Sequence, residues 1–168
     1  MKTKHFNIFF FIILYTSLIV GFLYNENLNS GAYTDWAGLN GPIIEDFSLK
    51  FKETFLSYEK YGHRHSPVYL IFLSTFSDLG LNLDSVRFIN LHFSLSLIFI
   101  FYSCLNLKFP SVEKKYLQLL SLVIFLSPTF RSLSIWPDSR LAGLFFFTLS
   151  IYFFLKFEKH NNLKNAWF

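Results

Sequence analysis

Apolar residues gather in this chain into long runs that are separated by polar stretches. The runs cover residues 6–24, 88–107, 116–134 and 141–156. The first has Asn7 as its only strongly polar member and is long enough to cross a hydrocarbon core of about 30 Å. The last run is short, but its flank can extend it. The pattern predicts an all-α, polytopic membrane helical bundle with about four transmembrane helices.

The segment 25–87 between the first two runs is polar enough to be a loop, yet it carries helical patterns of its own. Within 48–59, the aromatic residues Phe51, Phe55 and Tyr58 recur at i, i+4 and i+7. Charged and hydroxyl side chains lie away from this stripe. The spacing predicts an amphipathic helix that lies in the membrane interface.

A second helix is predicted after this one. Ser66 is suited to the N-cap and Pro67 to the first helical position, where a missing N–H costs nothing. The helix should end near Gly80, since glycine is the usual residue at a helix C-terminus. Its short apolar core is too brief to cross a bilayer. We expect Asp84 or Ser85 to cap the next span, which begins at Arg87.

Composition supports a membrane protein. Apolar residues make up 52% of the 168 residues, and 24 residues are phenylalanine, which is more apolar surface than a chain of this size usually hides. A cleaved signal peptide is the alternative for the first run, but the run is long and no A-x-A site follows it. The only cysteine is Cys104, so an intrachain disulfide and a cysteine-based metal cluster are excluded.

The formal charge of +4 comes from basic residues scattered at the ends of apolar runs, not from a patch with base-stacking aromatics, and no nucleic-acid partner is expected. Basic residues near span ends mark the cytoplasmic side. Their positions predict cytoplasmic termini and an outward-facing loop 25–87. These residues are Lys2, Lys4, Lys108, Lys114, Lys115, Lys156, Lys159 and Lys164.

Acidic residues in the loop are candidate catalytic groups. Asp35 follows the first run by about ten residues, close enough to the membrane to meet a lipid-borne phosphate or sugar. A carboxylate there can act as a general base if the geometry is right, or it can simply cap a helix. Glu45 and Asp46 precede the amphipathic helix, where negative charge is favourable without any catalysis. Asp46 is the better functional candidate, as a partner of Asp35 or a metal ligand, although carboxylates without defined spacing are a weak metal signal.

Basic residues in the loops are candidate phosphate-binding groups. His63, Arg64 and His65 come just before the predicted helix start, and imidazole with guanidinium beside a helix N-terminus suits an anion. The His-x-His spacing could bind zinc, but no third ligand is in sight, so no metal site is assigned.

Two further arginines lie near membrane ends. Arg131 follows closely on an apolar run, where a charge is costly and is usually paired or functional. Arg87 is either an interfacial side chain reaching toward headgroups or a phosphate ligand. Asp138 is mainly expected to cap the fourth span.

Taken in order, these features resemble the N-terminal module of the GT-C superfamily of integral-membrane glycosyltransferases, of the protein mannosyltransferase and aminoarabinose transferase type. That family has a first span, an outward loop with an early acid, interfacial helices introduced by a His-Pro-Pro-Leu-like motif, and an arginine that opens the next span. Asp35 falls at the place of the acid, and the stretch 65–68 (His-Ser-Pro-Val) at the place of the motif. The chain departs from the family in having Trp36 where relatives often have a second acid and Ser66 in place of the first proline.

The resemblance implies an enzyme that transfers a sugar from a polyprenyl-phosphate donor to a lipid, glycan or protein acceptor at the outer face of the membrane. Asp35 would be the general base. Arg64, His65, Arg87 and Arg131 would hold the donor phosphate, and no cofactor would be strictly required. It favours a bacterial-type inner membrane over the endoplasmic reticulum.

Two other classes stay open: a non-catalytic membrane subunit or truncated remnant, and a lipid-carrier transporter. The ending at 165–168 resembles the first turn of a further span. We therefore expect the chain to be the N-terminal module of a longer protein and inactive on its own.

Overall fold

The computed structural model describes residues 3–28 and 31–160, and all regular structure in these residues is helical. The all-α prediction is therefore confirmed for this part of the chain. Lys2 and the segment 161–168, which enter the topology and fragment expectations, lie outside the described residues. The α-helices are α1 Thr3–Leu23, α2 Ala32–Asp35, α3 Gly41–Leu56, α4 Val68–Asp78, α5 Leu83–Lys108, α6 Lys114–Leu122, α7 Pro128–Ile135 and α8 Ser139–His160. Shorter turns of π- or 3₁₀-helix are η1 Trp36–Asn40, η2 Tyr58–Tyr61 and η3 Val123–Leu126.

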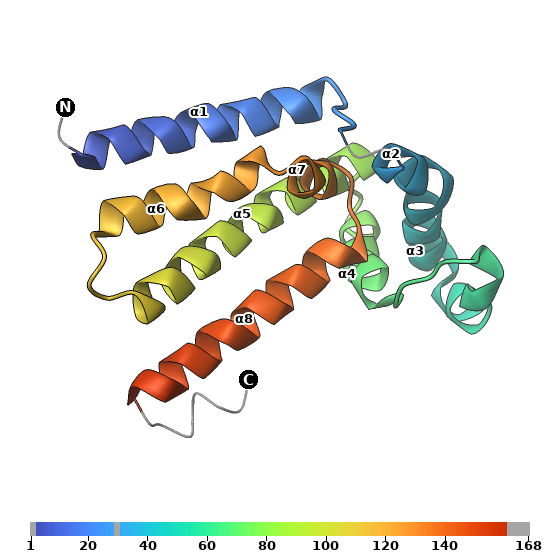
Figure 1. Ribbon diagram of the computed structural model, residues 1–168. Helices are drawn as coiled ribbons and strands as arrows, with labels where there is room; N and C mark the ends of the chain where they lie inside the picture. The colour runs from blue at the N-terminus through green and yellow to red at the C-terminus, as the bar shows by residue number, and fades with distance from the viewer. Residues whose placement is uncertain (1–2, 29–30, 161–168) are drawn as a thin grey trace.

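The long helices α1, α5 and α8 lie side by side with the shorter α6, and α5 packs between α6 and α8 (Figure 1). Two of them, α5 and the stretch Ser139–Lys159 of α8, are long and apolar enough to cross a membrane. The bent pair α6–α7 adds a third candidate if it is one span. The predicted first span coincides with α1, whose part Ile8–Leu23 is a shorter apolar helix. The described residues thus hold two to three candidate spans where the sequence predicts about four.

The predicted span 116–134 is not one helix. Its two halves, Lys114–Leu126 and Pro128–Ile135, meet at an angle of 70°. Ser127 between them has an extended backbone, and its Oγ accepts a hydrogen bond from the N–H of Phe130 at 3.2 Å. Pro128 has no N–H to continue the preceding helix, so the chain stops and restarts there. The bend turns α7 across the ends of the long helices.

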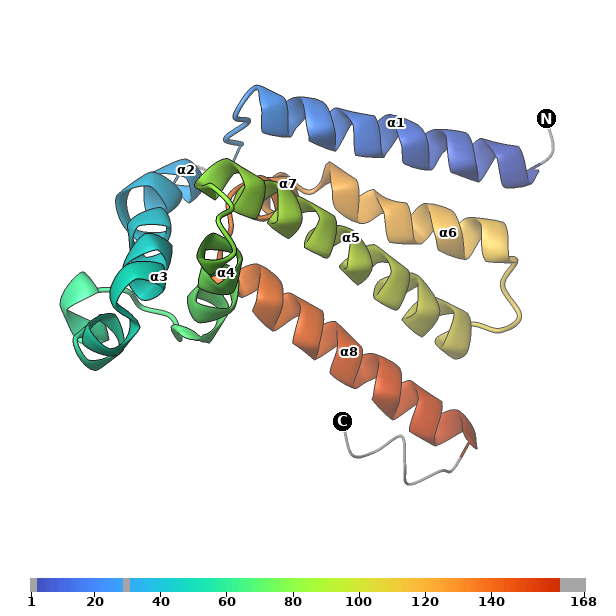
Figure 2. The ribbon, with the colours of Figure 1, turned by 180° about the vertical axis from the view of Figure 1, so that it is seen from behind.

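The loop segment 25–87 folds into short helices at one end of the bundle. Figures 1 and 2 show α3 running across the direction of the long helices, beyond the end of α5. The predicted helix over 48–59 is the second half of a longer one, because α3 begins at Gly41 with Pro42 in its first turn. The helix is kinked at Lys50, and Phe51 and Phe55 beyond the kink are exposed.

The predicted helix boundaries around α4 and α5 are partly right. Gly80, in the left-handed region at φ 83°, follows α4 at the predicted end. The N–H of Leu81 donates to the carbonyl of Phe76 and that of Gly80 to Ser77, the hydrogen-bond pattern of a Schellman motif. α5 begins four residues before the predicted Arg87, since Asn82 is the cap and accepts from the N–H of Ser85 at 2.9 Å. Arg87 therefore lies within the helix and is buried.

The core joins the long helices to the loop segment. Asn90 of α5 is fully buried and accepts a hydrogen bond from the hydroxyl of Tyr69 on α4. Its side-chain amide donates to the carbonyls of Leu133 and Ser134 on α7, at 3.0 and 2.8 Å. A single buried side chain thus fixes α4, α5 and α7 relative to one another. The largest fully buried side chains among the described residues are Phe47, Phe125, Leu18, Ile43, Ile44, Leu70, Leu73, Leu91, Leu97, Ile135, Leu141 and Val86.

Candidate functional site

A polar cleft of about 420 Å³ lies where three distant chain segments meet. The segments are the turn from α2 into η1, the loop after η2, and the junction of α7 with α8. We call it the polar cleft; it is lined by Asp35, Leu39, Asn40, Gly62, His63, Arg64, His65, Asp138 and Arg140. Three residues selected from the sequence, Asp35, Arg64 and His65, are therefore brought together.

Asn40 connects the three segments behind the cleft. It ends the π-helix η1, in which the N–H of Gly41 donates to the carbonyl of Trp36, and such turns are frequent at functional sites. The buried side-chain amide donates to the carbonyl of Pro137 at 2.9 Å, and Oδ1 lies 2.8 Å from Nε2 of His63. Because Oδ1 can only accept, His63 carries a proton on Nε2.

The other side of the His63 ring shapes the loop that carries Arg64. Its Nδ1 accepts from the backbone N–H of His65 at 3.2 Å. The Tyr58 hydroxyl lies 2.7 Å from the same nitrogen and donates to the carbonyl of His65 at 3.0 Å. Burial raises the pKa of Tyr58 to about 12, so the hydroxyl stays protonated at neutral pH. His63 is thus a positioning residue that holds Arg64 and His65 at the rim.

Arg140 and Asp138 form a bidentate pair on one wall. Nε and Nη2 of Arg140 donate to Oδ1 and Oδ2 of Asp138 at 2.8 and 2.9 Å. The backbone N–H of Arg140 also donates to Oδ1 at 2.7 Å, which makes Asp138 the N-cap of α8, as predicted. Burial alone would raise the pKa of Asp138, but the hydrogen bonds and charge of Arg140 hold it below the ordinary value of 3.8.

Asp35 faces this pair from the opposite segment. It is the last residue of α2, which begins after Gly31 in a left-handed conformation at φ 107°. Its carboxylate is half-exposed and Oδ2 lies 3.6 Å from Nη2 of Arg140. That separation is an ion pair, beyond hydrogen-bond distance. Asp35 therefore combines solvent access with a neighbouring cation.

Arg64 and His65 are exposed on the cleft rim. The imidazole of His65 packs edge-on against that of His63, with ring centroids 5.4 Å apart. The guanidinium of Arg64 makes no hydrogen bond or ion pair with the described part of the chain. Its donors are available to a ligand in the cleft.

Asp46 is not among the residues that line the cleft. The expectation that Glu45 and Asp46 precede a helix is wrong, because both lie inside α3. Asp46 accepts a hydrogen bond from the Tyr61 hydroxyl and pairs with Lys50 at 3.1 Å. The hydrogen bond from Tyr61 is the main cause that lowers the pKa of Asp46. The structure therefore gives Asp46 protein partners and does not bring it to Asp35.

The guanidinium of Arg87 is buried and makes hydrogen bonds only within the protein. Nη1 donates to Asp84 at 2.9 Å, Nη2 to Asn25 at 2.9 Å and Nε to the carbonyl of Ile135 at 3.3 Å. The group also stacks on the Trp136 ring at 3.7 Å from its centroid. Arg87 ties the start of α5 to α7 and to the end of α1, outside the cleft.

Arg131 is likewise held by protein groups. Its Nε and Nη2 donate to the two carboxylate oxygens of Glu26 at 2.7 and 2.6 Å. Nη1 and Nη2 also reach the hydroxyl and carbonyl of Ser17 on α1, at 3.2 and 3.1 Å. The side chain is about one-tenth exposed. Arg131 joins α7 to α1 and does not line the cleft.

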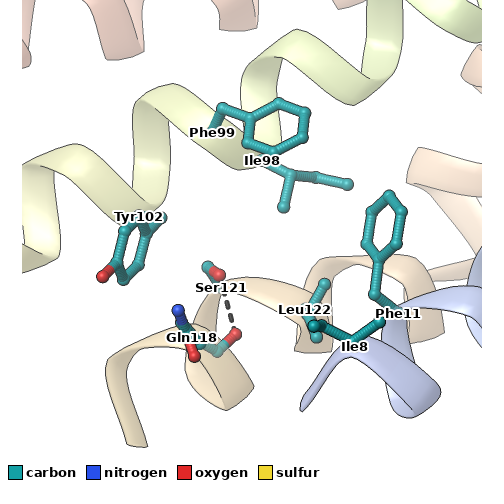
Figure 3. Close-up of a pocket in the computed structure, with 8 residues that line it drawn as sticks. All are labelled: Ile8, Phe11, Ile98, Phe99, Tyr102, Gln118, Ser121 and Leu122. Atoms are coloured by element: carbon teal, nitrogen blue, oxygen red, sulfur yellow. Dashed lines mark hydrogen bonds between the residues drawn. The ribbon is translucent and has the colours of Figure 1, made fainter. Parts of the chain in front are cut away.

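A separate apolar hollow lies between α1, α5 and α6 (Figure 3). Its volume is about 310 Å³, and its walls are mainly aliphatic and aromatic side chains such as Ile8, Phe11 and Phe99. Of the residues chosen from the sequence, none lines it. Across the described ranges 3–28 and 31–160, no group of three or more His, Cys, Asp or Glu side chains is placed to hold a metal ion.

Sequence reasoning missed Arg140 and Asn40. Arg140 follows the predicted cap Asp138 by two positions, but its role depends on Asp138 and on a contact with Asp35, more than a hundred positions earlier. Asn40 sits in a Gly-Leu-Asn-Gly-Pro stretch whose only signal was a turn-like composition. No protein-family model matches the chain, and neither a curated protein nor a solved structure matches it.

Proposed function

We propose that the chain is the membrane module of a GT-C-type glycosyltransferase. It transfers a sugar from a polyprenyl-phosphate donor to a lipid, glycan or protein acceptor, with Asp35 as general base. The observation that carries the proposal is the polar cleft, in which a half-exposed carboxylate lies beside cationic groups at one end of apolar helices. Asp35, Arg64 and His65, selected from the sequence for this reaction, lie together there.

The reaction has a simple balance of protons and charge. The acceptor oxygen forms a bond to the anomeric carbon of the sugar as its proton passes to Asp35. The bond from that carbon to the donor phosphate breaks, and the phosphate keeps the electron pair. The leaving group changes from a singly charged diester to a monoester of higher negative charge. Cations at the cleft stabilise this developing charge without supplying a proton.

The side chains that best fit this task are those with unused hydrogen-bond donors. Arg64 and His65 at the rim and Arg140 on the wall face the same space as Asp35. Arg87 and Arg131, also predicted as phosphate ligands, have their donors directed at protein groups. In the proposal they support the helices that carry the cleft. A catalytic role for Asp46 remains a prediction from sequence.

The proposal also places the chain in the membrane. All four apolar runs cross it, including α1 and the bent pair α6–α7, and both termini are cytoplasmic. The basic residues at the adjoining ends of α5 and α6 (Lys108, Lys114 and Lys115) and near the end of α8 (Lys156 and Lys159) support this direction. The polar cleft then faces outward, where a lipid-linked sugar and its acceptor meet.

Replacement of Asp35 by Asn tests the proposal. Membranes that hold the full-length protein are given a panel of polyprenyl-phosphate hexoses and pentoses, and label transferred to lipid, glycan and protein is measured. Loss of a general base should lower the transfer rate by about 10²- to 10⁴-fold. Asp78→Asn is the matched control, since Asp78 is an exposed carboxylate at the end of α4, outside the cleft.

Near-normal transfer by Asp35→Asn would overturn the role of Asp35. Transfer by neither the parent protein nor the control, with every donor of the panel, would favour the non-catalytic alternative.

A further inference from the structure

The guanidinium of Arg140 has one occupied edge and one open edge. Its Nε and Nη2 are engaged by the two oxygens of Asp138. An arginine carries five N–H donors, so the edge formed by Nη1 and the second hydrogen of Nη2 remains. Among the described residues, the other acidic partner of this guanidinium is Asp35, whose Oδ2 lies 3.6 Å from Nη2. Among the described residues no hydrogen bond is made to Nη1.

Asp138 is placed to aim this open edge. Its side chain is 6% exposed, and Oδ1 also receives the backbone N–H of Arg140. A carboxylate fixed by the backbone cannot turn freely, and a bidentate pair fixes the plane of the guanidinium. The geometry therefore fixes the guanidinium in the wall of the cleft, whose rim carries Arg64 and His65.

We propose that the open edge of Arg140 binds the phosphate group of a lipid-linked donor, with Asp138 as its positioning residue, and that this phosphate displaces Asp35 from Arg140. That this phosphate is lipid-linked rests on the proposed function above. Phosphate offers two oxygens to the fork, whereas Asp35 makes only one contact beyond hydrogen-bond length. Phosphate binding thus frees the Asp35 carboxylate.

The displacement sets an order of events. In the structure Asp35 is paired with Arg140, and its Oδ2 lies 3.6 Å from Nη2 of the guanidinium. Once a phosphate occupies Arg140, the two anions repel each other and the carboxylate is available to an acceptor hydroxyl. Donor binding therefore precedes activation of the acceptor.

Binding of farnesyl phosphate to the full-length protein in zwitterionic nanodiscs tests this without any transfer step. Farnesol is the control for the chain, and inorganic phosphate is the control for the headgroup. Arg140→Lys keeps the charge but loses the fork, and should weaken farnesyl phosphate binding by about 10- to 100-fold. Asp138→Asn keeps a helix cap and should weaken it by a smaller factor.

Asp35→Asn should change the affinity for farnesyl phosphate in the opposite direction. Removal of the competing anion should strengthen farnesyl phosphate binding by up to about fivefold, the size expected of an exposed ion pair. A merely structural Arg140 would not give this gain, and the test stands even if Arg140→Lys fails to fold. Lys60→Gln is the matched control, because Lys60 is an exposed cation on η2 that does not line the cleft.

The inference is overturned if Arg140→Lys binds within twofold of the parent protein, if Asp35→Asn binds more weakly, or if farnesyl phosphate binds no better than farnesol. Inorganic phosphate that binds as well as farnesyl phosphate would support the phosphate site but count against a lipid-linked donor. If binding depends on Arg140 but the protein has no transfer activity, the phosphate site is supported and the proposed function is refuted.

Discussion

Replacement of Glu26 by Gln should destabilise the protein, because it leaves the charge of Arg131 without a buried partner. The two side chains are 10% and 21% exposed, and their closest atoms are 2.6 Å apart. Removal of one partner from a fully buried pair costs about 3–5 kcal/mol. Since Glu26 is partly exposed and Gln retains one acceptor, we expect a loss of about 2–3 kcal/mol in the free energy of unfolding.

A double-mutant cycle isolates the pair. Arg131→Met alone leaves the carboxylate unpaired, and the double variant with Glu26→Gln leaves no charge at all. The double variant should be more stable than the sum of the single losses predicts, with a coupling energy of about 2 kcal/mol. The control pair is Lys108 with Glu158, which are 4.0 Å apart and 57% exposed, and Glu158→Gln should change stability by less than about 0.5 kcal/mol.

The free energy of unfolding is measured by titrating the protein in mixed micelles with sodium dodecyl sulfate. Tryptophan fluorescence is a suitable signal, because the indole N–H of Trp136 donates to the backbone carbonyl of Glu26 at 2.8 Å. A coupling below about 0.5 kcal/mol would refute the structural reading of the pair. A double variant that is stable but no longer binds farnesyl phosphate would instead support the sequence prediction that Arg131 binds the donor phosphate.

Three further outcomes are expected. Gly21→Ala should cost about 1–3 kcal/mol in unfolding free energy, because the new Cβ would lie 2.8 Å from Glu26 Oε2; equal stability would contradict this close contact. Asn40→Ala should weaken farnesyl phosphate binding and lower stability by about 1–3 kcal/mol, and binding unchanged within error would separate it from the cleft. The pKa of Asp46 is lowered in the folded state, so its contribution to stability is present above about pH 3.8 and is lost as the pH falls through the folded pKa. Because the hydrogen bond from Tyr61 is the main cause, Tyr61→Phe should weaken this pH dependence in unfolding titrations.

The sequence was sufficient for the helices that apolar periodicity marks, but it did not set their limits. The start of α3 was placed seven residues late, although Pro42 in its first turn is a start signal. The π-helix before it leaves no periodic trace. The break at Pro128 was visible as a Ser-Pro pair, yet a window average of hydropathy runs straight through it. Boundaries depend on single capping residues, which averaging over many positions conceals.

For the candidate site, the sequence identified the carboxylate Asp35 and the rim residues Arg64 and His65, but not Arg140 on the wall of the polar cleft. Asp35, Arg64 and His65 lie in one loop between two predicted spans, so the sequence assigned them to the same side of the membrane. Arg140 approaches Asp35 only because α7 turns across the bundle and α8 starts beside α2. A contact over such a sequence separation depends on tertiary packing, which no local pattern of residues encodes.

The arginines near this end of the bundle differ in how many of their N–H donors are already bound to protein oxygens. This difference indicates which of them can bind a ligand. The Arg87 and Arg131 side chains are about nine-tenths buried, and each of their three nitrogens donates to a protein oxygen. Withdrawal of such a donor to bind a phosphate would leave the partly buried Glu26 carboxylate or the buried Ile135 carbonyl short of a partner, at about 1–3 kcal/mol for each group. Arg140 is 44% exposed and loses only a loose contact with Asp35 when an anion arrives. The energetic cost of binding is therefore lower at Arg140 than at Arg87 or Arg131, although sequence reasoning passed Arg140 over.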